Sequence, residues 1–196
     1  MHFIFKLFFK PLLYNILTMK IILIGYMGSG KTTLGKALSL KKNVPFIDLD
    51  QYIEMKEGAS VRRIFKDRGE IYFRKIESYY LSELLASQED FVLAVGGGTP
   101  CFGNNMQLIT DSTEMVVYLK YQPKSLAERL LQEKHLRPLI ADIVDTDLED
   151  FIRKHLFDRN PFYMQAKYHI PMDGLTDVEG LKAIERVIDA PKSSSI

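Results

Sequence analysis

The sequence GYMGSGKT at residues 25–32 decides the fold of this chain. It follows the apolar run 21–24 and precedes the helix-compatible stretch 34–40, so we expect a strand, a glycine-rich turn and a helix in that order. This context is typical of the phosphate-binding loop GxxxxGK[ST]. Its glycines let backbone N–H groups face an anion, and the following helix directs its positive end there. The loop therefore predicts ATP or GTP with Mg²⁺ as the ligand.

Individual side chains of the loop have separate predicted roles. Lys31 reaches the β- and γ-phosphates, and the hydroxyl of Thr32 is a ligand for Mg²⁺. The sequence lacks the [NT]KxD element that a signalling GTPase uses to read guanine, which favours an ATP-dependent enzyme. The residues expected to contact the nucleotide here are Gly28, Ser29, Gly30, Lys31, Thr32 and Thr33.

Composition indicates a single compact domain. The chain has 196 residues, of which 46% are hydrophobic and 26% charged, enough for one buried core and few for two. A net charge of +1 and a pI near 7.8 disfavour nucleic acid as a partner. The single cysteine, Cys101, excludes an internal disulfide, so we expect a reducing, cytoplasmic location.

The two ends of the sequence differ from the rest. Residues 1–18 are rich in apolar side chains, but Lys6, Lys10 and Pro11 leave no run long enough to span a membrane. We expect residues 1–18 to be an extension outside the fold, with contact to a membrane surface as the alternative. The domain is expected over 19–190, followed by a tail at 191–196 of disordered composition.

Short apolar runs alternate with helical patterns along the domain. Strands are expected at 20–24, 45–49, 91–95, 115–119 and 168–170, and helices begin at Pro123 and cover 176–188. This alternation predicts an α/β fold in which helices cover both faces of a five-stranded parallel sheet.

Two chemically distinctive segments follow expected strands. Strand alternation would send Asp48 and Asp50 to the same side at the sheet's carboxyl edge, where one could support Mg²⁺ and the other accept a substrate hydroxyl. A helix N-cap is the alternative for this pair. The glycines at 96–98 would admit a substrate ring and expose backbone N–H groups, with an ordinary turn as the alternative.

Three arginines could recognise anionic groups. Arg74 would share a helix face with Glu70 and Glu77 through the spacings i, i+4 and i, i+3. Arg137 and Arg159 lie in the polar segments LRPL and RNPFY. A guanidinium suits bidentate binding of carboxylate or phosphate, although each arginine could also be a surface cation.

From about residue 20 to the last helix, the chain resembles the shikimate kinase family. The resemblance rests on an ordered set of motifs: GYMGSGKTTLG, DLD, GEIYFRKIE, VGGGTP, LRPL and RNPFY. It implies a P-loop, nucleoside-monophosphate-kinase-like three-layer fold with sheet order 2-3-1-4-5 and a mobile lid at about 133–142. It also implies ATP-dependent phosphorylation of the shikimate 3-hydroxyl, a step toward chorismate and the aromatic amino acids.

The resemblance implies roles for particular residues. Asp50 would bind the substrate hydroxyls as base or orienter, while Asp48 and Thr32 support Mg²⁺. Arg137 in the lid would close over the phosphates, joining Lys31 and Asp50 as catalytic residues. The remaining implied roles are a carboxylate clamp by Arg74 and Arg159, braced by Glu77; a ring lining of Gly97 and Gly98; pocket walls of Phe65 and Phe73; and a place near adenine for Arg129.

Three alternatives remain at this stage. A gluconate kinase would share the phosphate loop without a clear need for the arginine clamp and the glycine turn together. A nucleoside monophosphate kinase would place arginines around a second phosphate. A non-catalytic nucleotide-binding module belongs to another class, but it has no physical reason to keep the whole catalytic set. We expect ATP and shikimate as ligands of a monomer, with no membrane partner.

Overall fold

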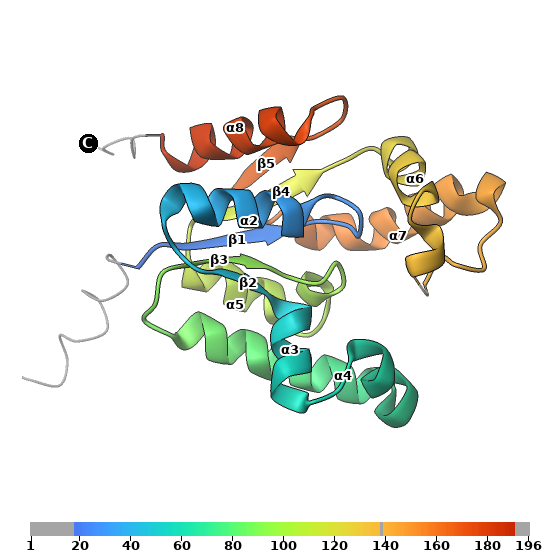
Figure 1. Ribbon diagram of the computed structural model, residues 1–196, viewed down its shortest axis with the longest axis horizontal. Coiled ribbons are helices and arrows are strands. Elements are labelled where there is room, and N and C mark those ends of the chain that lie inside the picture. Colours follow the sequence, from blue (N-terminus) through green and yellow to red (C-terminus); the bar gives the residue numbers. More distant parts are fainter. Residues whose placement is uncertain (1–17, 138, 191–196) are drawn as a thin grey trace, which may run out of the picture.

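One parallel sheet organises the molecule in the computed structural model, which describes residues 18–137 and 139–190. Its strand order is β2-β3-β1-β4-β5, the order that the resemblance implies, and every neighbouring pair is parallel (Figure 1). The five strands are β1 (Lys20–Ile24), β2 (Phe46–Asp48), β3 (Phe91–Ala94), β4 (Val116–Lys120) and β5 (Tyr168–Pro171). The predicted strands are confirmed, and no strand end differs from its predicted position by more than one residue.

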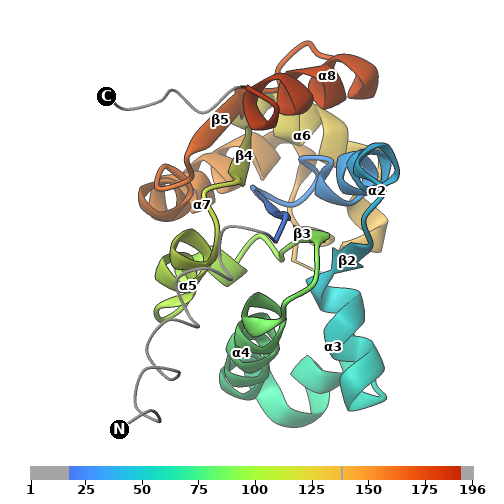
Figure 2. The ribbon, with the colours of Figure 1, turned by 90° about the vertical axis from the view of Figure 1, so that its left-hand side faces the viewer.

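Helices form a layer on each face of the sheet. Figures 1 and 2 show α2 and α8 on one face and α4, α5 and α7 on the other, while α3 and α6 lie toward its two edges. The helices are α2 (Lys31–Lys42), α3 (Leu49–Glu57), α4 (Val61–Ala86), α5 (Asn105–Ser112), α6 (Pro123–Leu131), α7 (Leu148–Tyr163) and α8 (Asp177–Ile188). Short 3₁₀ helices are η1 (Thr99–Cys101), η2 (Lys134–Leu136) and η3 (Asp145–Asp147).

The central strands explain why the sheet lies inside. All five residues of β1 are buried, because a strand covered by helices on both faces needs a continuous apolar run. The helix predicted from Pro123 begins there, and α8 begins after Thr176, whose side chain forms a capping box with Glu179. Among the described residues, no helix is both long enough and apolar enough to cross a membrane.

The carboxyl edge of the sheet collects the loops that carry the predicted motifs. The phosphate loop follows β1, and the glycine segment 96–98 follows β3. The strand alternation predicted for Asp48 and Asp50 is wrong, because β2 ends at Asp48 and Asp50 lies in the first turn of α3. The abrupt change from strand to helix, rather than alternation, places both carboxylates at this edge.

Helix α4 contains a break that the sequence marks with a glycine. Gly69 has φ 80° and ψ 172°, so the helix stops for one residue and resumes toward Arg74. Glycine reaches this conformation without the steric cost that a side chain adds. Three predicted features fall partly or wholly outside the described residues: the extension, of which 1–17 are not described, the tail 191–196, and Pro138 of the lid.

Candidate active site

The phosphate loop wraps around the side chain of its own lysine. Lys31 Nζ donates to the carbonyl oxygens of Gly25, at 2.9 Å, and Tyr26, at 2.8 Å. Gly30 caps α2 with φ 87°, a left-handed conformation that points the first N–H groups of the helix into the loop. Burial lowers the pKa of Lys31 to about 8, although the charges of Asp50 and Asp48 oppose this shift.

Asp48 accepts hydrogen bonds from both the phosphate loop and the first turn of α3. Thr32 Oγ1 donates to Asp48 Oδ2 at 2.9 Å, and the backbone N–H of Asp50 donates to Asp48 Oδ1 at 3.1 Å. The N-cap alternative is therefore correct for Asp48, and the same carboxylate still faces the phosphate loop. Burial raises the pKa of Asp50 to about 6, and the charges of Asp48 and Glu77 raise it further than Lys31 and Arg74 lower it.

The glycine segment fits between the two arginines of the predicted clamp. A Cβ atom at Gly98 would lie 2.7 Å from Nη2 of Arg74, and one at Gly97 would lie 3.5 Å from Nη1 of Arg159. Any side chain at Gly98 would displace the Arg74 guanidinium. The same segment also turns into η1, so the turn alternative is confirmed, and room for a substrate ring stays a prediction.

Arg74 is held by a buried carboxylate. Its Nη1 lies 2.7 Å from Oε2 of Glu77, which is 1% exposed, while Glu70 is farther from Nε at 3.6 Å and largely exposed. Thr99 Oγ1 donates to the other Glu77 oxygen at 2.6 Å. The predicted helix face of Glu70, Arg74 and Glu77 therefore exists, and Glu77 is its buried member.

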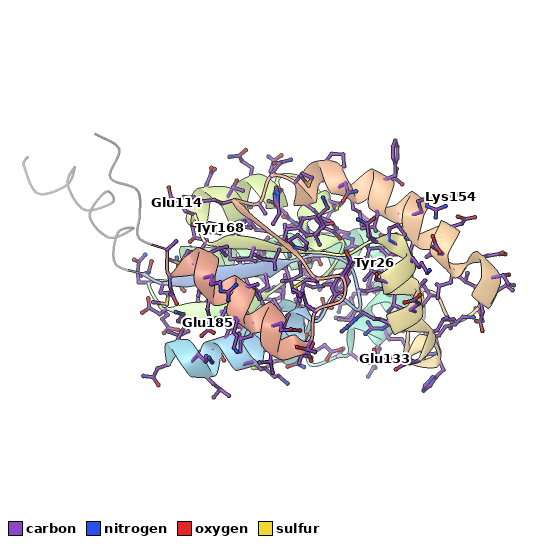
Figure 3. The ribbon with its side chains drawn as sticks, turned by 90° about the horizontal axis from the view of Figure 1, so that it is seen from above. Tyr26, Glu114, Glu133, Lys154, Tyr168 and Glu185 are labelled. Carbon is purple, nitrogen blue, oxygen red and sulfur yellow. The ribbon has the colours of Figure 1, made fainter. Side chains whose placement is uncertain are left out.

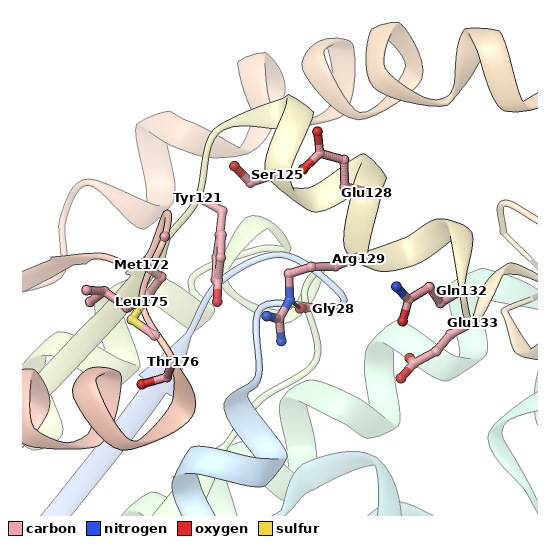
Figure 4. Close-up of a pocket in the computed structure, with 11 residues that line it drawn as sticks. Gly28, Tyr121, Ser125, Glu128, Arg129, Gln132, Glu133, Met172, Leu175 and Thr176 are labelled. Atoms are coloured by element: carbon pink, nitrogen blue, oxygen red, sulfur yellow. Dashed lines mark hydrogen bonds between the residues drawn. The ribbon is translucent and has the colours of Figure 1, made fainter.

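Two connected clefts run along this edge. The first, of about 250 Å³, is lined by Gly28, Gly30, Lys31, Thr32, Thr33, Asp48, Asp50, Gly96, Gly97, Arg129, Glu133 and Arg137, among others. It shares Gly28, Arg129 and Glu133 with a second cleft of about 560 Å³. In Figure 4 the second cleft lies between α6 and the loop before α8, with Tyr121 close to Arg129.

Arg129 and Arg137 lie where the two clefts meet. Arg129 Nε donates to the carbonyl oxygen of Gly28 at 3.1 Å, and its guanidinium carbon lies 5.3 Å from the centroid of the Tyr121 ring. Arg137 follows η2, and its Nη2 lies 2.7 Å from Oε2 of Glu133. Nε of Arg137 is buried without a hydrogen-bond partner among the described residues.

Other predicted and unpredicted residues surround the clefts. Phe65 and Phe73 pack together with ring centroids 4.5 Å apart, but Phe73 belongs to the core and neither ring lines these two clefts. Sequence reasoning missed Tyr121 and Tyr163, whose hydroxyl donates to the carbonyl oxygen of Gly97 at 2.5 Å. Tyr163 lies in the quoted motif RNPFY, so the motif itself was the available signal.

The oxygen atoms of the first cleft suit Mg²⁺. The hydroxyl of Thr32 and the carboxylates of Asp48 and Asp50 are hard ligands beside the loop expected to bind phosphate. Within residues 18–137 and 139–190, no group of three or more His, Cys, Asp or Glu forms a metal site. Mg²⁺ usually binds one or two protein carboxylates together with water and substrate phosphates.

A phosphate loop, a carboxylate pair and converging arginines on this sheet define a P-loop kinase of small molecules. Residues 27–189 match the sequence pattern of the shikimate kinase family. The chain therefore belongs to the shikimate kinase family and is a kinase. This membership excludes the predicted gluconate kinase and nucleoside monophosphate kinase alternatives and disfavours a non-catalytic module.

Individual relatives agree with this assignment. Shikimate kinase from Flavobacterium johnsoniae is 43% identical over 165 residues, which cover 84% of this chain and 96% of the relative. The crystal structure of shikimate kinase from Bacteroides thetaiotaomicron has a TM-score of 0.80 at 39% identity and covers 87% of this chain and 98% of its own. Acinetobacter baumannii shikimate kinase, solved in complex with shikimate, has a TM-score of 0.79 at 32% identity, with coverage of 90% and 96%.

Proposed function

We propose that this chain transfers the γ-phosphoryl group of ATP to the 3-hydroxyl of shikimate, forming shikimate 3-phosphate and ADP. The observation that carries this proposal is the convergence of Arg74 and Arg159 on Gly97 and Gly98, next to Asp50 and the phosphate loop. Two guanidinium groups suit a carboxylate ligand, and the glycines leave room for a ring between the clamp and the phosphates. The shikimate complex of the Acinetobacter relative supports the same acceptor.

The clamp orients the acceptor before reaction. Arg74, fixed by Glu77, and Arg159 hold the carboxylate at the far end of the ring. The 3-hydroxyl then lies near Asp50, which accepts its hydrogen bond. When the carboxylate and the 3-hydroxyl of the acceptor are both held, the hydroxyl oxygen points at the γ-phosphorus. Such orientation is a large part of catalysis in phosphoryl transfer.

Asp50 receives the proton of the attacking hydroxyl. As the hydroxyl oxygen bonds to the γ-phosphorus, the bond from that phosphorus to the β,γ-bridging oxygen breaks, and ADP carries away the bridging oxygen. A pKa near 6 leaves Asp50 ionised at neutral pH and a better proton acceptor than an ordinary aspartate. Lys31 and Arg137 stabilise the negative charge on the equatorial oxygens of the transferred group.

Thr32 and Asp48 would hold Mg²⁺. The ion supplies positive charge that neutralises the β- and γ-phosphates. The adenine ring would occupy the larger cleft, where Tyr121 and Arg129 offer an aromatic face and a planar cation. Arg129 also donates a hydrogen bond to Gly28, so it would connect the larger cleft, where adenine would bind, to the phosphate loop.

The assembly and location of the enzyme complete the proposal. We take the functional unit to be a monomer, because both clefts are formed by side chains of one chain. We take its location to be the cytoplasm, because a chain with a single cysteine suits a reducing compartment. Light scattering at the assay concentration tests the monomer. A dimer whose activity falls on dilution would contradict it.

An acceptor panel tests the reaction. We would measure ADP release from the purified chain with Mg·ATP alone and with shikimate, gluconate or AMP. Strong stimulation by shikimate alone is expected. Stimulation by another acceptor would keep the fold and mechanism but overturn the substrate, whereas nucleotide binding without any acceptor effect would favour the binding module.

A further inference from the structure

Tyr26 is a buried aromatic residue inside the phosphate loop. It occupies one of the variable positions of the loop motif, so phosphate binding alone does not require an aromatic residue there. Only 1% of its surface is exposed, and Figure 3 shows it inside the molecule, whereas Lys154 of α7 extends from the surface. The guanidinium carbon of Arg159 lies 5.1 Å from the centroid of the Tyr26 ring. This distance is within the range of a cation–π contact.

Tyr26 is held at its backbone and at its ring hydroxyl. Its carbonyl oxygen accepts a hydrogen bond from Lys31 Nζ at 2.8 Å, and its hydroxyl lies 3.1 Å from Nδ1 of His155. His155 precedes Arg159 by one turn of α7 and packs against Phe151, with ring centroids 4.1 Å apart. Burial raises the pKa of Tyr26 to about 12, so its hydroxyl keeps its proton.

The two arginines of the clamp are held by different means. Arg74 has the buried carboxylate of Glu77, whereas Arg159 forms no ion pair in the part of the chain that the structure describes. An aromatic ring orients a guanidinium without neutralising it, because the contact uses the face of the cation and leaves its in-plane N–H donors free. Arg159 therefore keeps its charge for a ligand, while the Tyr163 hydroxyl also lies near its guanidinium.

We propose that Tyr26, whose hydroxyl is hydrogen-bonded to His155, is a positioning residue that orients the Arg159 guanidinium. In this way Tyr26 raises the affinity of the site for the acceptor's carboxylate. The inference rests on the proposed function, in which Arg159 binds that carboxylate. It adds a direct link between the phosphate loop and the carboxylate clamp. Tyr26 acts through Arg159 and has no contact with the reacting atoms.

Calorimetric binding of shikimate and of its neutral carboxamide tests the inference on the full chain. We expect Tyr26→Leu to weaken shikimate binding about five- to tenfold, between the values for an exposed and a desolvated cation–π pair. Carboxamide binding and Mg·ADP binding should change less than twofold. In an Arg159→Met background, Tyr26→Leu should have no further effect on shikimate, because the two residues act as one unit.

His155 provides variants that leave the phosphate loop intact if Tyr26→Leu fails to fold. His155→Leu removes the hydrogen-bond partner of the Tyr26 hydroxyl and should weaken shikimate binding. His155→Asn, which retains a polar atom near the position of Nδ1, should restore most of the binding. Tyr121→Leu is the matched control, since it removes a different tyrosine–arginine stack, that of Tyr121 with Arg129. It should weaken Mg·ADP binding and spare the preference for shikimate over the carboxamide.

The outcomes separate the inference from the proposed function. If the parent chain binds shikimate and the carboxamide equally, the carboxylate clamp is wrong, and the role of Tyr26 fails with it. If the parent prefers shikimate but Tyr26→Leu weakens both ligands equally, or weakens shikimate further without Arg159, only the inference is overturned.

Discussion

At the scale of single residues, Asp50 lowers the stability of the folded chain, because its carboxylate is buried beside other negative charges. Its carboxylate is largely removed from water and lies near the negative charges of Asp48 and Glu77. Both effects disfavour the ionised form, which the proposed reaction needs at neutral pH. The residue that accepts the proton should therefore also destabilise the folded state.

We expect Asp50→Asn to lower kcat by about 10²- to 10⁴-fold, the range for loss of a proton acceptor, while stabilising the fold at neutral pH. The folded pKa of Asp50 is about 6 against an ordinary value of 3.8, so the folded chain binds more protons between these pH values and loses stability as pH rises through them. Removing the charge should gain about 1–3 kcal/mol above pH 7 and almost nothing below pH 4. Urea unfolding at both pH values measures this difference.

Asp147 offers a control for the loss of one negative charge, because it is exposed at the start of α7. Asp147→Asn should leave kcat nearly unchanged. It should not reproduce the gain of stability at neutral pH. An Asp50→Asn variant that is less stable than the parent at pH 7 would show that the charge of Asp50 does not destabilise the folded state.

We expect Arg74→Leu to weaken both substrate binding and the fold. A charge-assisted contact to the acceptor's carboxylate is worth about 1.5–3 kcal/mol, so the KM for shikimate should rise at least about tenfold. The same change leaves the buried carboxylate of Glu77 without its cation, which costs about 3–5 kcal/mol in a buried pair. Steady-state kinetics and thermal melting, with Arg74→Leu/Glu77→Leu as a companion variant, separate the two effects.

The companion variant should recover much of the lost stability, because no buried charge remains unpaired, but it should keep the raised KM. An unchanged KM in both variants would remove Arg74 from the clamp. The sequence contained the residues of this pair and their spacing. It could not indicate that Thr99 would satisfy the second oxygen of Glu77, since that contact joins two segments through the fold.

At the scale of elements, the segment around η2 brings two charged residues, Glu133 and Arg137, to the phosphate cleft. Arg137 lines the cleft, and the flanking Glu133 holds it through an i, i+4 ion pair. Glu133 is mostly exposed, so this pair contributes little stability. The ion pair can therefore open at small cost when phosphates compete for the guanidinium.

We expect Arg137→Ala to reduce turnover much more than substrate affinity. An arginine that stabilises the transferred phosphoryl group contributes about 10³- to 10⁵-fold to the rate in related reactions. Arg153→Ala is a matched control, because Arg153 is exposed and pairs with Glu149 and Asp150 of its own helix. Its kcat should stay within twofold of the parent, and a similar result for Arg137→Ala would exclude the catalytic role.

Most elements could be predicted because their patterns are local. The central strands β1, β3 and β4 contain continuous apolar runs, and Pro123 and Thr176 mark helix starts. The end of β2 was misplaced because Leu49 extends the apolar pattern while Asp48 already caps a helix. The order of the strands depends on pairing across the sheet, so only the resemblance to a known family supplied it.

At the scale of the whole molecule, the parallel sheet explains why distant motifs form one site. The phosphate loop, Asp48 and the glycine segment follow β1, β2 and β3, whose carboxyl ends lie at one edge. Helices α4 and α7 then bring Arg74 and Arg159 to that edge. The motifs could be predicted one by one, whereas the contact of Arg159 with Tyr26 required the packing of α7.

The amino end of the sheet gives the last prediction, which concerns a chain that starts at Met19. The Met19 N–H donates to Asp90 Oδ1 at 2.5 Å, and its carbonyl oxygen accepts from the Phe91 N–H at 2.9 Å. A new amino terminus at Met19 would be a cation beside the same carboxylate, so the contact should persist as an exposed ion pair worth about 0–1 kcal/mol. We therefore expect kcat within twofold of the full chain and a melting temperature within a few degrees. A chain that starts at Leu23 loses buried Ile21 and Ile22 from the central strand and should not fold. Circular dichroism with the ADP-release assay compares the three chains, and loss of activity in the Met19 chain would assign residues 1–18 a necessary role.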